Sequence, residues 1–135
     1  MPGTLPFAAD EHDAWAQASL STVHLHRRRL DAGARAARRA IDLNANLAIA
    51  EFTYGAAMAW SGQYDATMEH TDKAERLSPR DPAHAWFMLN RVVVAFVVGR
   101  YEEQIEWAEK MTEAAPDHPA GWRILAAGNG LLRVA

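Results

Sequence analysis

The chain has 135 residues, the length of a single domain, and half of them are apolar, which is sufficient for a buried core. Its net charge of −3 provides no overall attraction to nucleic acid or to an anionic membrane surface. Because the chain has no cysteine, disulfide and thiolate chemistry are excluded, and we expect a reducing, cytoplasmic environment.

The first predicted helices follow a short segment that is rich in proline. Residues 1–9 predict a flexible lead, without the basic and apolar segments of a secretion signal. Helices are predicted over 14–26 and 31–43, and the second contains many alanines and arginines, which are strong helix formers. Asn44 and Asn46 then provide a break and a cap for the next helix.

Glycine and proline separate the remaining predicted helices. The next pair covers 47–60 and 64–77, with Gly62 in the turn, and a rigid connector that contains Pro79 and Pro82 follows it. The last predicted helices cover 82–98, 101–114 and 119–132. No segment has the pattern of a strand, so the sequence predicts an all-α fold. The longest nearly apolar run lies within the helix over 82–98, and it is too short to cross a bilayer.

The turn sequences repeat along the chain. Residues 61–65 are echoed by 98–102, and in both copies a proline follows the glycine by 17 positions, at Pro79 and Pro116. A weaker similarity relates 40–46 to 74–80 at an offset of 34 residues. Similarity at a period of this size predicts stacked helical hairpins.

This pattern resembles the tetratricopeptide repeat, a helix-turn-helix unit of 34 residues with the signature W-x2-L-G-x2-Y, A-x3-F and P. Counting back from Pro79 places Gly55 at the signature glycine, and Thr67, Thr71 and Ala74 in slots of the second helix. In the last unit the signature W, L and G correspond to Trp122, Leu125 and Ala126. The resemblance covers about 14–132 and implies a right-handed α-solenoid of about three and a half repeats and seven helices.

The expected repeat domain covers residues 10–135. Its units are about 14–46, 47–81, 82–118 and an incomplete 119–135. The step from Gly62 to Gly99 is 37 residues, and we expect the three extra residues in the first helix of the third unit or at its entry. Because that helix is apolar nearly all round, we expect it at the centre of the structure or of a dimer.

A second, looser resemblance concerns the third unit. Residues 77–82, followed by an aromatic helix, are similar to repeat regions attached to bacterial class III adenylate cyclases and to some transcriptional regulators. This resemblance implies a non-catalytic, regulatory or associative role in a bacterial signalling protein.

In the fold that this chain resembles, the first helix of each unit lines a concave groove. Groove contacts with a protein or peptide are therefore expected from the following residues: Trp15, Ile49, Phe52, Ala56, Trp60, Trp86, Phe96 and Arg123. Such an apolar groove suits an amphipathic helix or an apolar peptide. The alternative interpretation is that these aromatic residues form the core or are covered by the chain's own ends.

Some members of the family clamp a C-terminal carboxylate with Lys, Asn and Arg from successive first helices. The corresponding positions here are Ala18, Thr22 and Thr53, so we expect no such clamp. The incomplete last unit predicts a homodimer that buries its apolar face, with contacts from the following residues: Ile124, Leu125, Leu131 and Leu132.

Charged residues form two zones. The basic zone contains six arginines between Arg27 and Arg39, and the acidic zone contains five glutamates between Glu102 and Glu113. An arginine-rich helix is usually a solvated face, so we expect no binding of nucleic acid; the alternative is contact with the acidic zone of another molecule.

We expect no metal site, no cofactor and no catalytic residue. His24 and His26 lie two positions apart, so a helix would point them in different directions, and the acidic residues fall mostly at helix starts and on solvent faces. The leading function is a protein–protein interaction module. The alternatives are a homo-oligomerisation unit without a separate ligand, and a peptide or small-molecule sensor that uses the groove.

Overall fold

The computed structural model describes residues 6–80 and 84–117 together with Arg123 and Gly130. Six helices lie in these ranges, and no strand is found there. They are α1 (Pro6–His26), α2 (Leu30–Leu43), α3 (Ala48–Trp60), α4 (Tyr64–Leu77), α5 (His84–Val97) and α6 (Tyr101–Ala114). The predicted seventh helix and the four predicted dimer contacts fall outside the described residues, as do Trp122 and the start of the helix predicted from Pro82.

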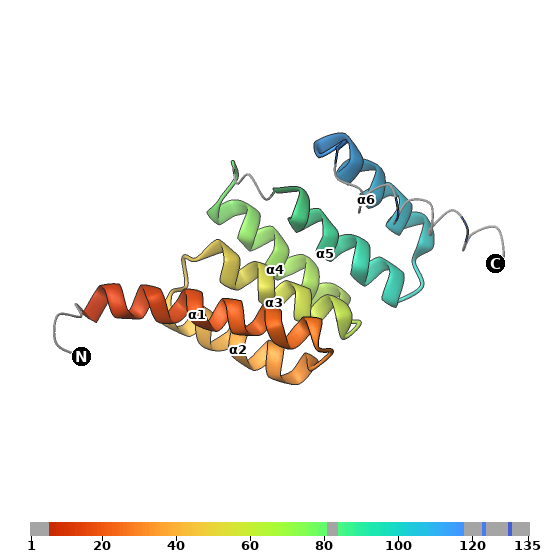
Figure 1. The fold of residues 1–135 in the computed structure, drawn as a ribbon. Coiled ribbons are helices and arrows are strands. Elements are labelled where there is room, and N and C mark those ends of the chain that lie inside the picture. The colour runs from red at the N-terminus through yellow and green to blue at the C-terminus, as the bar shows by residue number, and fades with distance from the viewer. Residues whose placement is uncertain (1–5, 81–83, 118–122, 124–129, 131–135) are drawn as a thin grey trace.

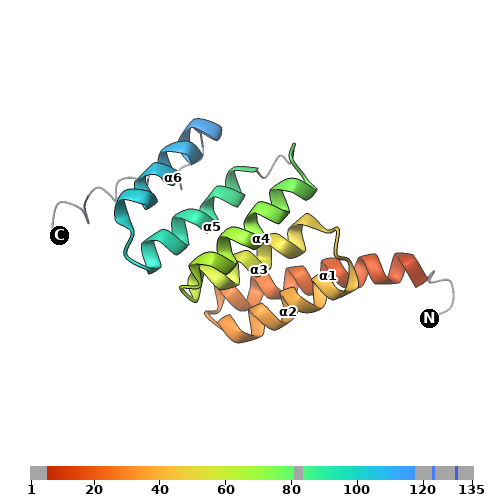
Figure 2. The ribbon, with the colours of Figure 1, turned by 180° about the vertical axis from the view of Figure 1, so that it is seen from behind.

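The helices form three hairpins that follow one another along the molecule. Each hairpin pairs two consecutive helices: α1 with α2, α3 with α4, and α5 with α6. The first helix of each hairpin also contacts the first helix of the next, so α1, α3 and α5 lie in one continuous row. Figure 2 shows the same order of hairpins from behind. The arrangement confirms the all-helical repeat organisation.

The start of α1 differs from the prediction. We expected a flexible lead over residues 1–9 and a helix from Ala14, whereas α1 already begins at Pro6. Proline is well suited to the first position of a helix, because its fixed φ is helical and the N–H that it lacks would have no partner there. The proline that we interpreted as part of a loose lead is therefore the start of the helix.

Each hairpin turns through one residue with positive φ. These residues are Arg28, Gly62 and Gly99, with φ of 59°, 74° and 83°. In all three turns the next amide donates to a carbonyl near the helix end: Arg29 to His24 at 2.8 Å, Gln63 to Met58 at 2.9 Å and Arg100 to Ala95 at 2.7 Å. This is the hydrogen-bond pattern of a Schellman motif, so the three positions are equivalent in the repeat.

The repeat register follows from these turn residues. Trp15, Ile49 and Trp86 each lie 13 positions before the turn residue of their own hairpin. The core between the helices is built mainly from alanines, including Ala18, Ala40 and Ala50, which allow the helix backbones to approach closely. Because positions counted back from each turn are equivalent, the corresponding side chains of successive first helices lie side by side.

A candidate protein-binding face on α1, α3 and α5

The equivalent residues Trp15, Ile49 and Trp86 line one hollow of about 500 Å³. Its other lining residues come from the starts of α3 and α5, from the connectors before them and from the end of α4: Asn46, Leu47, Ala48, Phe52, Leu77, Ser78 and Phe87. None of the ten residues is charged. Since the hollow is formed by the same position of three repeats, it is a product of the stacking rather than of any one hairpin.

Aromatic side chains give the hollow its shape. Phe52 and Phe87 pack with their ring centroids 5.4 Å apart, and Phe87 is buried. Trp15 and Trp86, by contrast, remain 48% and 40% exposed. Large apolar side chains that are held at the rim of a hollow yet stay half exposed are typical of binding surfaces rather than of cores.

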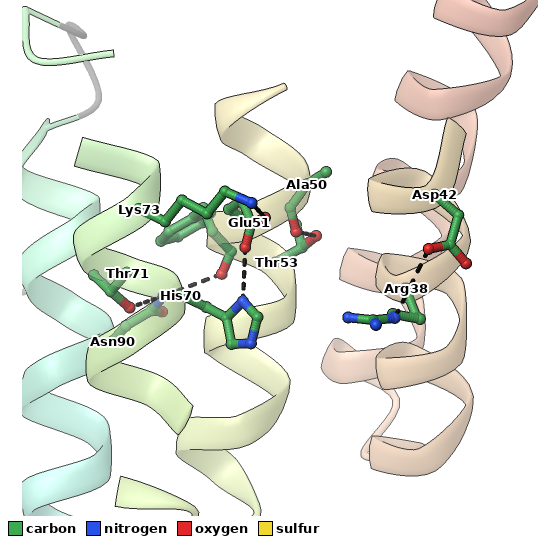
Figure 3. Close-up of polar contacts among 10 residues, drawn as sticks. Arg38, Asp42, Ala50, Glu51, Thr53, His70, Thr71, Lys73 and Asn90 are labelled. Atoms are coloured by element: carbon green, nitrogen blue, oxygen red, sulfur yellow. Dashed lines mark hydrogen bonds and ion pairs between the residues drawn. The ribbon is translucent and has the colours of Figure 1, made fainter. Parts of the chain in front are cut away.

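The single charged residue of α3 faces away from the hollow. Glu51 is only 1% exposed, and its carboxylate lies 2.7 Å from His70 Nδ1 and 2.9 Å from Lys73 Nζ, both on α4 (Figure 3). We had expected the acidic residues mostly at helix starts and on solvent faces; Glu51 does lie in the first turn of α3, but it is buried rather than on a solvent face. The two partners on α4 compensate the cost of burying the carboxylate.

The single charged residue of α5 is also buried against α4. Arg91 is 4% exposed, and its guanidinium donates to Asp72 and Glu75 at 2.5 Å each. It also lies over the ring of Trp107, 4.8 Å from the centroid. Burial alone would lower the pKa of Arg91, but the hydrogen bonds and charges of the two carboxylates raise it above its usual value.

The exposed side of α3 and α5 is therefore free of formal charge. The charged residue of each helix, Glu51 on α3 and Arg91 on α5, pairs with side chains of α4. The other side chains of both helices carry no formal charge. We call the exposed side of α1, α3 and α5 the open face. It carries the hollow at the N-terminal ends of α3 and α5 and near the middle of α1. Trp60 and Val97, 50% and 40% exposed, lie at the C-terminal ends of α3 and α5.

The predicted groove residues divide into two groups. Trp15, Ile49, Phe52 and Trp86 come together in the hollow, whereas Ala56, Trp60, Phe96 and Arg123 do not line it. Phe96 is 44% exposed and lies beside Tyr101 of α6, with the ring centroids 6.3 Å apart. Val97, which we had not selected, occupies the position of Trp60, because each lies two residues before its turn residue.

Two of the three positions compared with a carboxylate clamp are buried, and the third, Thr22, is exposed. Ala18 and Thr53 are each 1% exposed, and the Thr22 hydroxyl donates to the Ala18 carbonyl at 3.2 Å. The buried Ala18 and Thr53 are not available to a ligand, and the absence of a clamp stays a prediction. The open face of α3 and α5 carries no exposed lysine or arginine, since the single arginine there, Arg91, is buried.

A second hollow of about 650 Å³ lies along α6, and the sequence had not indicated it. Charged side chains of both signs line it, including Arg100, Glu102, Glu106 and Lys110 around Trp107. Throughout the described ranges, this hollow included, no three potential ligands are grouped to hold a metal ion. None of the described helices combines the length and hydropathy needed to span a bilayer.

Comparisons with known proteins identify the fold. No protein-family model matches the chain, and no curated protein matches its sequence significantly. Among the solved structures that resemble it is the TPR domain of OM64 from Arabidopsis, with a TM-score of 0.71 over 88% of this chain and 96% of that domain. The chain has the fold of a tetratricopeptide repeat domain. The two sequences are 13% identical, so the comparison shows a common TPR fold and assigns no role to individual residues of this chain.

Proposed function

We propose that this TPR-like domain is a non-catalytic protein-interaction module that binds an apolar or amphipathic segment of a partner on its open face. The observation that carries the proposal is the absence of charge from the exposed sides of α3 and α5, next to a hollow lined by Trp15, Phe52 and Trp86. A contiguous exposed apolar surface of this kind usually marks an interaction site.

A labelled synthetic amphipathic helix provides the direct test. Its fluorescence anisotropy should rise on addition of the domain, because the peptide buries its apolar stripe against the open face. Trp60→Ala should weaken binding, and Trp86→Ala should weaken it further, since Trp86 lines the hollow. Leu43→Ala is the matched control, because Leu43 is 41% exposed on α2 and should leave both folding and binding unchanged.

Two outcomes would replace this function. Concentration-dependent self-association that Trp60→Ala abolishes would favour the homo-oligomerisation unit. Dimerisation that depends instead on Ile124, Leu125, Leu131 and Leu132 would favour the dimer contacts proposed from the sequence. A peptide affinity that does not change in either tryptophan variant would overturn the proposed face.

A small apolar molecule is the second candidate ligand. The volume of the hollow falls within the roughly 300–1,000 Å³ of ligand pockets, and its lining is apolar with two polar neighbours, Asn46 and Ser78. Native mass spectrometry of the purified chain tests this function. An added mass that disappears in Trp86→Ala would favour the sensor, and a spectrum of the bare chain would favour the interaction module.

We also propose that the domain acts as a regulatory part of a bacterial signalling protein in the cytoplasm. The sequence similarity of residues 77–82 and the lack of cysteine support this proposal. Chemical crosslinking in the source cells, followed by mass spectrometry, should identify a signalling enzyme or a transcriptional regulator as the crosslinked partner. Crosslinks confined to envelope proteins would contradict it.

A further inference from the structure

The turn between α1 and α2 carries three consecutive exposed arginines, Arg27, Arg28 and Arg29, which we call the arginine corner. Among the described residues, no acidic side chain lies within ion-pair distance of any of them. Other arginines of the molecule do contact side-chain partners: Arg38, Arg39, Arg91 and Arg100. The three arginines of the corner therefore carry positive charge that is not neutralised by an ion pair with the described residues.

The backbone at the corner adds a second observation. Arg28 has a φ of 59°, in the left-handed region, where the equivalent turn residues are Gly62 and Gly99. L-residues carry a steric penalty in this region that glycine avoids. A turn that keeps an arginine at a glycine position accepts a cost to stability, and such costs are found where the residue has a function.

The corner borders the open face at a defined end. The three hairpin turns lie at the same end of the molecule, where α1, α3 and α5 terminate (Figure 1). Trp60 and Val97 are each two residues before their turns, whereas the hollow lies at the opposite ends of α3 and α5. The open face therefore runs from an uncharged hollow to an edge with positive charge.

We propose that the arginine corner binds the acidic first turn of an amphipathic partner helix, which then runs antiparallel to α1, α3 and α5. This inference rests on the proposed function of the open face. Charge complementarity supports it, because acidic residues stabilise a helix at its N-terminus and would there meet three arginines, with Asp31 the nearest acidic residue in the chain. The antiparallel direction also brings the positive end of the partner's dipole to the negative ends of the three helices.

The spacing along α3 fits such a helix. Phe52 at the hollow and Trp60 at the other end are eight residues apart, which corresponds to about 12 Å along the helix axis. Apolar residues two turns apart on the partner have a similar separation of about 10.5 Å. One anchor would lie in the hollow and the second on Trp60, and the acidic turn would extend to the arginine corner.

The test uses three labelled synthetic helices with the same apolar stripe. The first has acidic residues in its first turn, the second has them in its last turn, and the third has none. At low salt the first helix should bind the wild-type domain roughly fivefold to tenfold more tightly than the second, since exposed charge pairs contribute modestly. This preference should disappear in Arg27→Ala/Arg29→Ala and should persist in Arg76→Ala, which removes an exposed arginine from α4.

The outcomes separate this inference from the proposed function. Equal binding of the three helices, still weakened by Trp60→Ala, would overturn the role of the corner and leave the open face as the binding site. Tighter binding of the helix with the acidic last turn would overturn the antiparallel direction. If none of the helices binds the wild-type domain, both the proposed function and this inference fail.

Discussion

The hydroxyl of Thr71 on α4 lies too close to Gly55 of α3 to leave room for a methyl group on that glycine. A Cβ at Gly55 would approach Thr71 Oγ1 to 2.9 Å and Asn90 Nδ2 to 3.0 Å. Asn90 donates to Thr71 Oγ1 and to the Phe52 carbonyl, so the hydrogen-bonded neighbours cannot simply move away (Figure 3 shows Thr71 and Asn90). Three helices therefore meet at the signature glycine.

Gly55→Ala should destabilise the domain by about 1–3 kcal/mol through overpacking. Urea unfolding followed by circular dichroism measures this change. Gly55→Ala combined with Thr71→Ala should lose less stability than the sum of the two single losses, because the second change removes the atom that the new methyl group meets. Additive losses would show that the clash at Thr71 does not limit the packing.

Arg28→Gly should stabilise the domain by about 1 kcal/mol, because glycine removes the steric cost of the left-handed conformation. Gly62→Ala and Gly99→Ala should each lower the free energy of unfolding by about 1–2 kcal/mol, because alanine carries this steric cost at a positive φ. Arg27→Gly is the control, since Arg27 has no positive φ and should gain nothing. An equal gain in both arginine variants would point to charge relief rather than backbone strain.

Arg91 should tolerate the loss of either carboxylate better than the loss of both. Asp72→Asn or Glu75→Gln alone should cost about 1 kcal/mol, because the other carboxylate still pairs with the guanidinium. The double variant leaves a buried positive charge without a counter-ion and should cost about 3–5 kcal/mol. Unfolding free energies of the single and double variants measure the coupling, and strict additivity would contradict it.

Stability should fall above pH 10 through Tyr64. The hydrogen bond to Glu103, with smaller contributions from burial and the charge of that carboxylate, raises the pKa of Tyr64 above 10.0. The unfolded state then loses its phenolic proton first, so this contribution is complete below pH 10 and is lost as the pH rises through the folded pKa. As the pH rises from 9 to 11, the urea midpoint of Tyr64→Phe should fall less than that of the wild type. An equal fall in both proteins would contradict the prediction.

The sequence predicted the hairpins well because their turns depend on local chemistry. Gly62 and Gly99 supply the positive φ that a helix end needs, and Pro79 and Pro116 follow at a fixed distance. The sequence did not identify Arg28 as the third turn residue, because an arginine does not indicate a left-handed backbone conformation. Its position 34 residues before Gly62 was the one available indication.

The candidate site was harder to predict because it depends on contacts between hairpins. Glu51 is buried through His70, 19 residues away in the chain, and Lys73, and no local pattern marks such a pair. Phe96 was chosen in place of Val97 because the longer third step blurred the register at the start of that helix. Counting from the turns removes the ambiguity, since the turn geometry is the same in all three hairpins.

The hollow has one equivalent side chain from each hairpin at its rim, namely Trp15, Ile49 and Trp86. Trp15 and Trp86 stay 48% and 40% exposed, whereas Ile49 is partly buried and packs against the core cluster of Ala18, Ala40, Ile41 and Ala50. Ligand preference can therefore diverge in the first or the third hairpin by exchange of a single half-exposed tryptophan, while the core beneath stays the same. Variants at Trp15 alone offer a direct route to altered specificity.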